Sequence, residues 1–348
     1  MAFRNLIRKR ITIYLLVNFV VMTAVITSVI GVTISRTSRE DAVKYALEMT
    51  RSIALELDSL ISQHQLMAVT IASILGSDPT KDRAKVKKLL LDLFDKSDWI
   101  VATYAGYEPD AFDGNDKPWR GAPTHTLQGQ FVPFVHAYPE FGMIHDLSKA
   151  FVDSLRDIDK WDFYQGPKRT NAPFITPPWT YRDPNTNVLS KIVCLTAPIK
   201  WPDGTFRGMA GVNIDTGALL KKYNSFQVFE HGLVFIIFRD GMLLTYPDED
   251  ITFSKTIFDI RDRFGGADLD KLVADIAAGR SGWIDGLHPI SKRKSLIVYY
   301  PVQTSEWGVV MVAPLRDIQA NRNSLILAIV AILVFLTCIF LLAVRFVT

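Results

Sequence analysis

Two long stretches without a charged residue lie near the two ends of this chain, and they constrain it more than any other feature. Residues 11–35 hold apolar residues together with Ser, Thr, Asn and Tyr, and residues 324–344 are equally free of charge. A helix of about 20 apolar residues can cross the hydrocarbon core of a bilayer. Both stretches therefore predict membrane-spanning helices, whereas the apolar run 232–238 between them has only the length of a strand.

A cleaved signal peptide is the alternative interpretation of the first stretch. The apolar core of a signal peptide usually has about 7–15 residues and ends at a small-residue cleavage site. Residues 11–35 form a longer stretch that leads directly into a helical pattern. An uncleaved anchor is therefore the better interpretation.

Basic residues beside the two stretches predict their orientation. Four of the first ten residues are Arg or Lys, and Arg345 directly follows the second stretch. Cytoplasmic flanks carry the excess of Lys and Arg, so residues 1–10 and 345–348 are expected inside. A few basic residues on the other side weaken this bias without reversing it. The sequence thus predicts a two-pass protein of the inner (plasma) membrane, with residues 36–322 in the periplasm or the extracellular space.

Charge and cysteine content exclude two classes of protein. The net charge is only +3 and no long basic run occurs, so the chain lacks the basic surface of a nucleic-acid-binding protein. Its two cysteines, Cys194 and Cys338, belong to the exported region and to the second apolar stretch. They cannot pair with each other, so a large hydrophobic core, not a disulfide framework, must stabilise the exported region.

The exported region divides into a stalk helix and two modules. Residues 36–78 carry apolar side chains at helical spacing, and the helix must end before Pro79 because proline disfavours helix at the preceding residue. Residues 79–222 and the smaller segment 223–320 each combine helical with strand-like patterns. The expected fold class is α+β, in which each module has an antiparallel sheet with helices on one face.

Strand patterns and turn signals locate the elements of the two modules. Asp203–Gly204 is a hairpin signal in the first module. The expected elements of the first module are a helix at 81–95 and strands at 99–107, 188–199 and 206–214, with a loop-rich stretch at 108–179. Those of the second module are strands at 232–238, 242–246, 282–285, 295–302 and 307–313, with a helix at 267–279.

Several short strings, in their order and spacing, resemble those of one family of sensor domains. They are Tyr107–Gly114 (YEPDAFDG), Gly129–Phe134 (GQFVPF), Phe163–Tyr164 followed by Trp179, Gly208–Ile214 (GMAGVNI), and Asp240–Gly241 with Tyr246–Pro247. Together they resemble the double CACHE (dCache_1-type) domains of chemoreceptors, sensor kinases and diguanylate cyclases. The resemblance covers nearly all of residues 36–320.

This resemblance implies a fold and a place for the ligand. It implies two tandem PAS-like (CACHE) modules flanked by transmembrane helices, a homodimer joined along the stalk, and a small-molecule pocket in the membrane-distal module, 79–222. Aromatic residues are dense there, as in most ligand pockets, although any one of them could simply fill the core. The expected ligand-binding residues are Tyr104, Tyr107, Phe134, Trp161, Asp162, Tyr164, Trp179, Tyr181, Asn213 and Asp215.

The ligand class is less well defined by the sequence. Amino-acid sensors of the family resembled here hold the ligand carboxylate with an Arg and the ammonium with an Asp, and this chain has Trp161 and Asn213 at those positions. The departure argues against an ordinary α-amino acid unless Asp215 or Asp162 substitutes. Asp162 beside aromatic walls would suit an amine, with a solvated surface residue as the alternative. Basic residues at 156–169 could serve an anion instead.

Other chemistry finds little support. The acidic segment 108–116 lacks the spacing of an EF-hand loop, and the six histidines show no paired zinc spacing. No nucleophile elbow, Walker loop or dinucleotide fingerprint occurs, so no enzyme activity and no cofactor are expected in this region.

The output of such a receptor is expected outside these residues. Only four residues follow Val344, so the signalling module is either cut away or supplied by a separate partner. The alternative function, from another class, is a membrane-anchored scaffold whose aromatic module binds a protein of the cell envelope.

Overall fold

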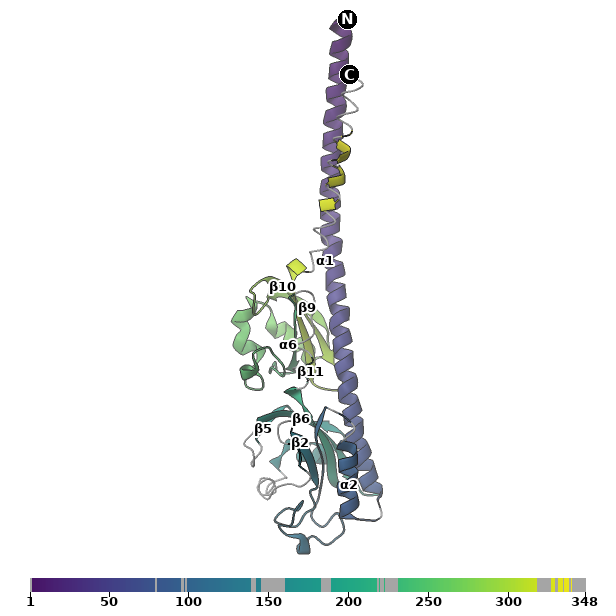
Figure 1. The fold of residues 1–348 in the computed structure, drawn as a ribbon, viewed down its shortest axis with the longest axis vertical. Coiled ribbons are helices and arrows are strands. Elements are labelled where there is room, and N and C mark those ends of the chain that lie inside the picture. The colour runs from purple at the N-terminus through teal and green to yellow at the C-terminus, as the bar shows by residue number, and fades with distance from the viewer. Residues whose placement is uncertain are drawn as a thin grey trace.

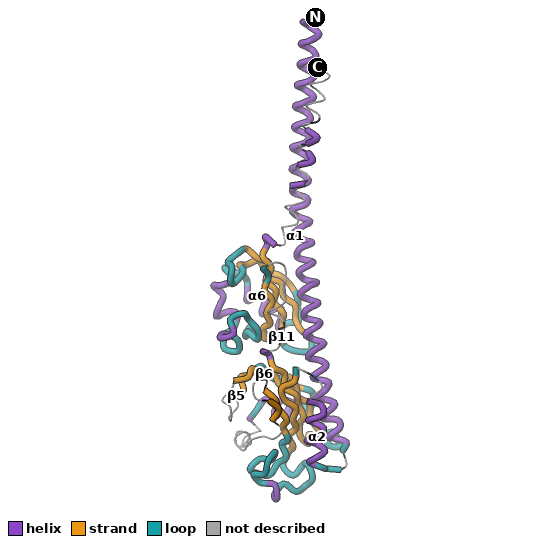
Figure 2. Tube along the Cα trace, in the orientation of Figure 1, coloured by secondary structure: helices purple, strands orange, loops and turns teal. Residues whose placement is uncertain are grey.

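In the computed structural model, one long helix carries two separate sheets along its side (Figure 1). The structure describes residues 2–78, 80–94, 97, 99–138, 142–144, 160–182, 189–217, 219, 222, 231–317, 327–328, 331–333, 335–337 and 339. The smaller sheet lies beside the middle of the helix, and the larger sheet lies beside its C-terminal end. Figure 2 shows that loops gather at the end of the larger module farthest from the chain termini.

The long helix α1 (Ala2–Ser77) has 76 residues. At about 1.5 Å per residue it is about 114 Å long. Between residues 46 and 75 one side of α1 is buried, with Ile53, Leu57 and Ile61 each at most 2% exposed. These side chains belong to a hydrophobic core that also includes residues of both sheets. The helix therefore connects the two modules mechanically through a shared core.

The larger sheet is antiparallel and has the strand order β3-β2-β1-β7-β6-β4, with β5 also paired to β6. Helix α2 (Arg83–Phe94) packs against β1 on the α1 side through Leu90, whose carbonyl accepts a hydrogen bond from the Thr103 hydroxyl at 2.8 Å. The strands are β1 (Ile100–Tyr107), β2 (Phe134–Tyr138), β3 (Gly142–Ile144), β4 (Phe174–Ile175), β5 (Trp179–Arg182), β6 (Leu189–Lys200) and β7 (Phe206–Asp215). In the described part of this module, η1 (Lys117–Trp119) and α4 (Asp162–Thr170) are further helices.

The smaller sheet is also antiparallel, with the order β8-β11-β10-β9. One face packs on α1, and the other packs on α6 and η4 around a second core that contains Phe235 and Phe264. The elements are β8 (Leu233–Phe238), η3 (Glu249–Ile251), η4 (Ile257–Phe264), α6 (Leu269–Ala277), β9 (Gly282–Leu287), β10 (Lys294–Val302) and β11 (Trp307–Pro314). These observations confirm the expected α+β class with two antiparallel sheets.

One expectation about secondary structure is wrong. Residues 242–246 form only isolated bridges instead of a strand, because the Thr245 hydroxyl accepts the backbone N–H of Ile236 at 2.9 Å and replaces a ladder bond. The loop-rich stretch 108–179 also contains the short elements η1, β2, β3, α4 and β4, which the sequence did not predict. Helix α4 escapes a pattern search because it is short and holds Gly166 and Pro167, which disfavour helix.

The expected membrane spans are not confirmed. Within the described part of the chain, no helix combines the length and the apolarity that crossing a bilayer requires. Much of 324–344, including Cys338, lies outside the described residues.

Candidate ligand-binding site

The face of the larger sheet that points away from α1 brings several of the predicted residues together. Side chains alternate along a strand, so Val212 and Ile214 of β7 point into the core shared with α1. Met209 of β7 belongs instead to a small cluster on the opposite face, together with Tyr104 of β1. We call this opposite face, with the side chains of α4 that cover it, the distal face.

Tyr104 lies at the centre of the distal face. Its ring stacks on Phe134 of β2, with 5.3 Å between ring centroids, and meets the edge of Phe163 of α4 at 5.9 Å. It also lies directly over Gly211, where an added Cβ would come within 2.6 Å of the ring. The register of β1 and β7 explains this contact, because Tyr104 pairs with Gly211. Only a glycine on β7 leaves room for the tyrosine ring.

The hydroxyl group of Tyr104 is buried, and no oxygen or nitrogen atom of the described residues bonds to it. Its polar neighbour is the Cys194 thiol, which is only a weak hydrogen-bonding group. The side chain is only 3% exposed. Burial raises the pKa of Tyr104 well above its ordinary value, and the nearby Cys194 thiol adds to this effect. The group is therefore a neutral phenol that can donate a hydrogen bond and accept one.

Asn213 lies on the distal face of β7, two residues after Gly211. It pairs with Ala102 of β1 on one side and with Cys194 of β6 on the other, so it lies in the middle of the sheet. The side chain is 4% exposed, and its Oδ1 atom has no hydrogen-bond partner. Two buried polar groups on one face thus lack partners, although buried polar groups in proteins are nearly always hydrogen-bonded.

Helix α4 covers part of the distal face with aromatic side chains. The Trp161 ring lies 5.3 Å from Trp179 of β5 and 6.1 Å from Phe163, measured between centroids. The indole N–H of Trp179 donates to the Cys194 sulfur at 3.4 Å. These contacts join α4, β5 and β6 into one aromatic wall beside Asn213.

Tyr164 and Glu108 hold α4 against the end of β1. Tyr164 is fully buried and donates a hydrogen bond from its hydroxyl to Glu108 Oε1 at 2.6 Å. Lys168 Nζ lies 2.7 Å from the same carboxylate oxygen. The two charges therefore neutralise each other at the rim, and Tyr164 positions the helix.

A family model for the Cache domain matches residues 34–322 of this chain. The chain belongs to the Cache domain family. Solved structures of extracellular sensor domains share the fold. The extracellular domain of mmHK1S-Z3, described as a histidine kinase, is 27% identical with a TM-score of 0.71, and the match covers 82% of this chain and 98% of that one. No curated protein sequence matches.

Two more distant structures have the same Cache fold. The periplasmic sensory domain of the Campylobacter jejuni chemoreceptor Tlp1 is 17% identical with a TM-score of 0.62, covering 81% of this chain and 98% of that one. The ligand-binding domain of the Pseudomonas fluorescens chemoreceptor CtaA, solved with L-leucine, is 16% identical with a TM-score of 0.54, covering 80% and 97%. At this level of sequence identity, the comparison shows a similar fold and nothing about the ligand.

Three of the predicted residues, Tyr107, Asp162 and Asp215, stand apart from the centre of the distal face of this Cache domain. Tyr107 is on the other face of β1, where it packs on Phe112 and Phe131 in the core. Asp162 is exposed at the start of α4. Asp215 is at the end of β7, where its Oδ1 accepts the Gly217 N–H at 2.7 Å. The Tyr181 side chain lies outside the described residues, although its backbone pairs with β6.

Sequence reasoning missed Cys194, Met209, Gly211 and Phe163 as residues of the distal face. The signal was present in part, because Met209 and Gly211 precede Asn213 by even numbers of residues and must share its face. Cys194 could not be found this way, since the β6–β7 register that pairs it with Asn213 becomes visible only in the folded sheet.

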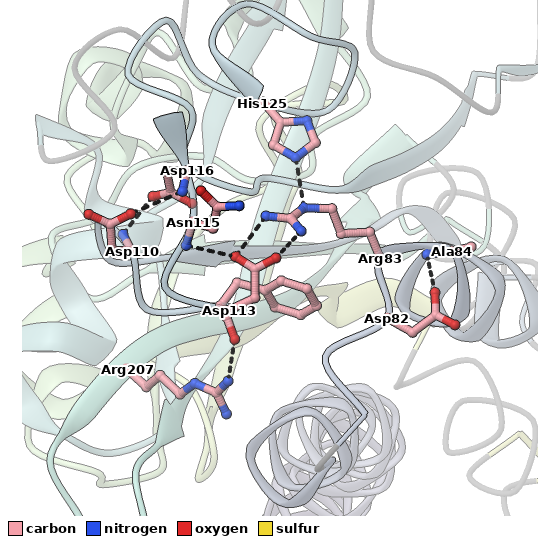
Figure 3. A network of polar contacts seen from close by, with 10 residues as sticks. Asp82, Arg83, Ala84, Asp110, Asp113, Asn115, Asp116, His125 and Arg207 are labelled. Carbon is pink, nitrogen blue, oxygen red and sulfur yellow. Dashed lines mark hydrogen bonds and ion pairs between the residues drawn. The ribbon is translucent and has the colours of Figure 1, made fainter. Parts of the chain in front are cut away.

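The acidic segment 108–116 of the Cache domain forms a structural turn held by arginines (Figure 3). Arg83 of α2 forms a two-pronged ion pair with Asp113, and its Nε donates to His125 Nε2 at 3.1 Å. Arg207 of β7 donates to the carbonyls of Ala111 and Phe112, each at 2.9 Å. These contacts hold the segment against α2 and β7.

Asp110 and Asp116 close the same turn through backbone hydrogen bonds. Asp116 Oδ2 accepts the Asp110 N–H at 2.6 Å, and Asp110 Oδ1 accepts the Asp116 N–H at 3.0 Å. Among the residues that the structure describes, no group of three or more His, Cys, Asp or Glu side chains is arranged to hold a metal.

Proposed function

We propose that this chain is the small-molecule-sensing region of a transmembrane signalling receptor, with its pocket on the distal face. The observation that carries the proposal is the pair of buried, unpartnered polar groups on Tyr104 and Asn213 beneath an aromatic cover. An unpartnered buried polar group costs about 1–3 kcal/mol. A ligand that bonds to both groups recovers this cost on binding. The membership of the Cache family and the sensor domains that share the fold support the same conclusion.

Anchoring in the membrane by two segments is part of the proposal. Between residues 14 and 25, Tyr14, Val21 and Met22 are more than half exposed, as lipid-facing side chains are. Described residues between 327 and 339 lie beside the N-terminal part of α1 (Figure 1), and Val20 of α1 and Thr337 line one groove, which supports a pairing of the two apolar stretches. The modules would then lie in the periplasm or outside the cell, with the smaller one nearer the membrane.

A parallel homodimer along α1 also belongs to the proposal. Along the part of α1 that packs on the two sheets, residues 45–75, four large apolar side chains are exposed: Tyr45, Leu55, Leu66 and Ile74. At about 100° per residue they fall within one arc of about 100°, opposite the side that packs on the sheets. A stripe of this kind fits the same stripe on a second copy. The output could be that of a chemoreceptor, a sensor kinase or a diguanylate cyclase.

The structure alters the weight of the ligand classes expected from the sequence. Binding of an amine was expected to rest on Asp162, which is exposed at the start of α4 and lies away from the buried polar groups. We therefore propose a small metabolite as the ligand without preferring an amine. Binding of a protein of the cell envelope is the alternative function.

A thermal-unfolding screen of the chain in lipid nanodiscs tests the sensing function. The panel contains amines, amino acids, organic acids and nitrogen heterocycles, because a ligand that binds only the folded state raises the melting temperature. We expect a specific rise that Trp161→Ala abolishes, since this indole forms the aromatic wall with Trp179. Lys294→Ala, at an exposed position on β10, is the control. No rise with any compound would favour the scaffold function.

A further inference from the structure

We propose that the distal face binds an uncharged, planar molecule that presents a hydrogen-bond donor next to an acceptor, such as a cyclic amide or a nitrogen heterocycle. This inference rests on the proposed sensing function and names the ligand class of the same site. It is drawn from the buried polar groups, the charges beside them and the shape of the aromatic walls.

The Asn213 amide defines the donor and acceptor pair. Its Oδ1 is buried without a partner, and the side chain makes no hydrogen bond to any described residue. A primary amide has an acceptor oxygen and a donor nitrogen side by side. A ligand edge with an N–H next to a carbonyl or ring nitrogen satisfies both ends at once. Either orientation of the amide leads to the same requirement, because exchanging its oxygen and nitrogen only reverses the order of donor and acceptor on the ligand.

The Tyr104 hydroxyl supplies a second neutral contact on the same side. Tyr104 pairs with Gly211, two residues before Asn213, so the two positions are about 7 Å apart along β7. This spacing is spanned by one ring with a polar substituent. A phenol and an amide can both satisfy a neutral molecule without any charge being buried.

Among the residues that the structure describes, the charged groups near the distal face are engaged in contacts or exposed. Glu108 accepts from Tyr164 and pairs with Lys168. The Asp215 carboxylate accepts the Gly217 N–H at the end of the strand, and Asp162 is exposed. An ammonium or carboxylate placed against Asn213 would meet a neutral amide and keep most of its desolvation cost. An uncharged ligand avoids this cost.

The walls favour a flat ligand. Tyr104 and Phe134 stack within 20° of parallel, and Phe163 stands nearly perpendicular to Tyr104 at 79°. Trp161 and Trp179 add two larger rings beside them. Aromatic rings bind a planar molecule through stacking and edge contacts, which gain more than burial of area alone.

Isothermal titration calorimetry on the whole chain in lipid nanodiscs tests the ligand class. The uncharged probes are uracil, 2-pyridone and nicotinamide, and the charged probes are putrescine, L-leucine and malate. We expect at least one uncharged probe to bind and to bind more tightly than every charged probe. Tighter binding of a charged probe overturns this inference and leaves the sensing function standing. If no probe of either kind binds, the ligand class and the sensing function fail together.

Two variants test whether the named groups make the contacts. Asn213→Asp replaces the donor end by a second acceptor, so we expect at least tenfold weaker binding of the uncharged probe, while Asn115→Asp at an exposed position changes nothing. Tyr104→Phe keeps the ring and removes only the hydroxyl, and we expect about a fivefold loss, on the order expected for one neutral hydrogen bond. Thermal unfolding confirms that each variant is folded. Unchanged affinity in both variants would overturn the inference.

Discussion

At the scale of single residues, Arg83 connects α2 to the loops of the larger module. Its guanidinium pairs with Asp113, donates to His125, and lies 4.5 Å from the centroid of the Trp119 ring. The two charged side chains are only 14% and 20% exposed. Loss of the arginine would therefore leave a largely buried carboxylate without its partner, which is more costly than the pair is stabilising.

Arg83→Gln should lower the free energy of unfolding by about 2–3 kcal/mol, somewhat below the range for a fully buried pair. The matched control is Arg51→Gln, which breaks an exposed pair with Glu48 on α1 and should cost at most about 0.5 kcal/mol. Urea unfolding of both variants checks the difference. Equal losses would show that the Arg83 contacts contribute no more than a surface pair.

The same network predicts a pH dependence that begins near neutral pH. Burial is the main reason why the pKa of His125 is lowered from 6.5, and Arg83 lowers it further, against the opposing effects of the Pro123 carbonyl and Asp113. The unfolded chain therefore takes up a proton at a higher pH than the folded chain. Stability from this group is complete above about pH 6.5 and decreases as the pH falls from there toward the lowered pKa.

Unfolding by urea at a series of pH values tests this prediction with His125→Gln. We expect the variant to lose part of the decrease below pH 6.5 and to keep the part that comes from His288, whose pKa burial also lowers. Asp113 acts in a separate, more acidic pH range, because its pKa is lowered from 3.8 in the folded chain. Its contribution to stability is complete above pH 3.8 and is lost as the pH falls through the lowered pKa. An unchanged slope between pH 6.5 and 5 in the variant would contradict the assignment.

At the scale of elements, strands with strong alternation could be predicted and elements made by tertiary contact could not. Strands β1, β6 and β7 coincide closely with the expected ranges, because their apolar runs and the Asp203–Gly204 turn are local signals. Helix α4 depends on packing, with the Phe174 ring so close that a Cβ on Gly166 would clash at 2.2 Å. No local pattern encodes such a contact.

The same distinction holds for the candidate site. Tyr104, Tyr164 and Trp179 could be selected from their strings, but the strings do not tell which side of a strand faces the ligand. Tyr107 is three residues from Tyr104 on β1, and an odd separation places the two rings on opposite faces. A count of residues along the strand would have separated them once β1 was assigned.

Strand β6 also makes a contact that joins the two modules. Lys191 Nζ donates to the hydroxyl of Thr252, which is buried in the smaller module, and lies 5.7 Å from the centroid of the Phe253 ring. Lys191 is the neighbour of Ile192 and lies three residues before Cys194 of the distal face. A shift of β6 on ligand binding would therefore move the loop that carries Phe253. The backbone of Phe253 is in the left-handed region, with φ of 62°.

A double-mutant cycle with Lys191→Met and Thr252→Val measures this contact. We expect a coupling energy of about 1 kcal/mol or more in the free energy of unfolding, as for groups in direct contact. Lys88→Met in combination with Thr252→Val is the control, because Lys88 pairs with Asp92 on α2 and has no such contact with Thr252. Additive effects for Lys191 and Thr252 would mean that the contact does not couple the modules.

At the scale of the whole molecule, α1 connects every part that a signal would have to cross. One side of the helix packs on both sheets, and its N-terminal part continues beyond the smaller module. A displacement in the larger module would therefore be carried along a single helix. The exposed apolar stripe lies on the opposite side of α1. If two copies pair through this stripe, the displacement of α1 would change their contact directly.

Cysteine cross-linking in membranes tests this arrangement in a Cys338→Ser background. Leu66 is 63% exposed and lies in the middle of the stripe, so Leu66→Cys should form a disulfide-linked dimer under mild oxidation when two α1 helices are parallel and in register. Ser291→Cys, at an exposed position in the loop between β9 and β10, should remain monomeric. The remaining cysteine, Cys194, is buried and cannot contribute. Failure of Leu66→Cys and of Leu55→Cys to cross-link would exclude pairing through this stripe, and the helix would then have to act within one chain.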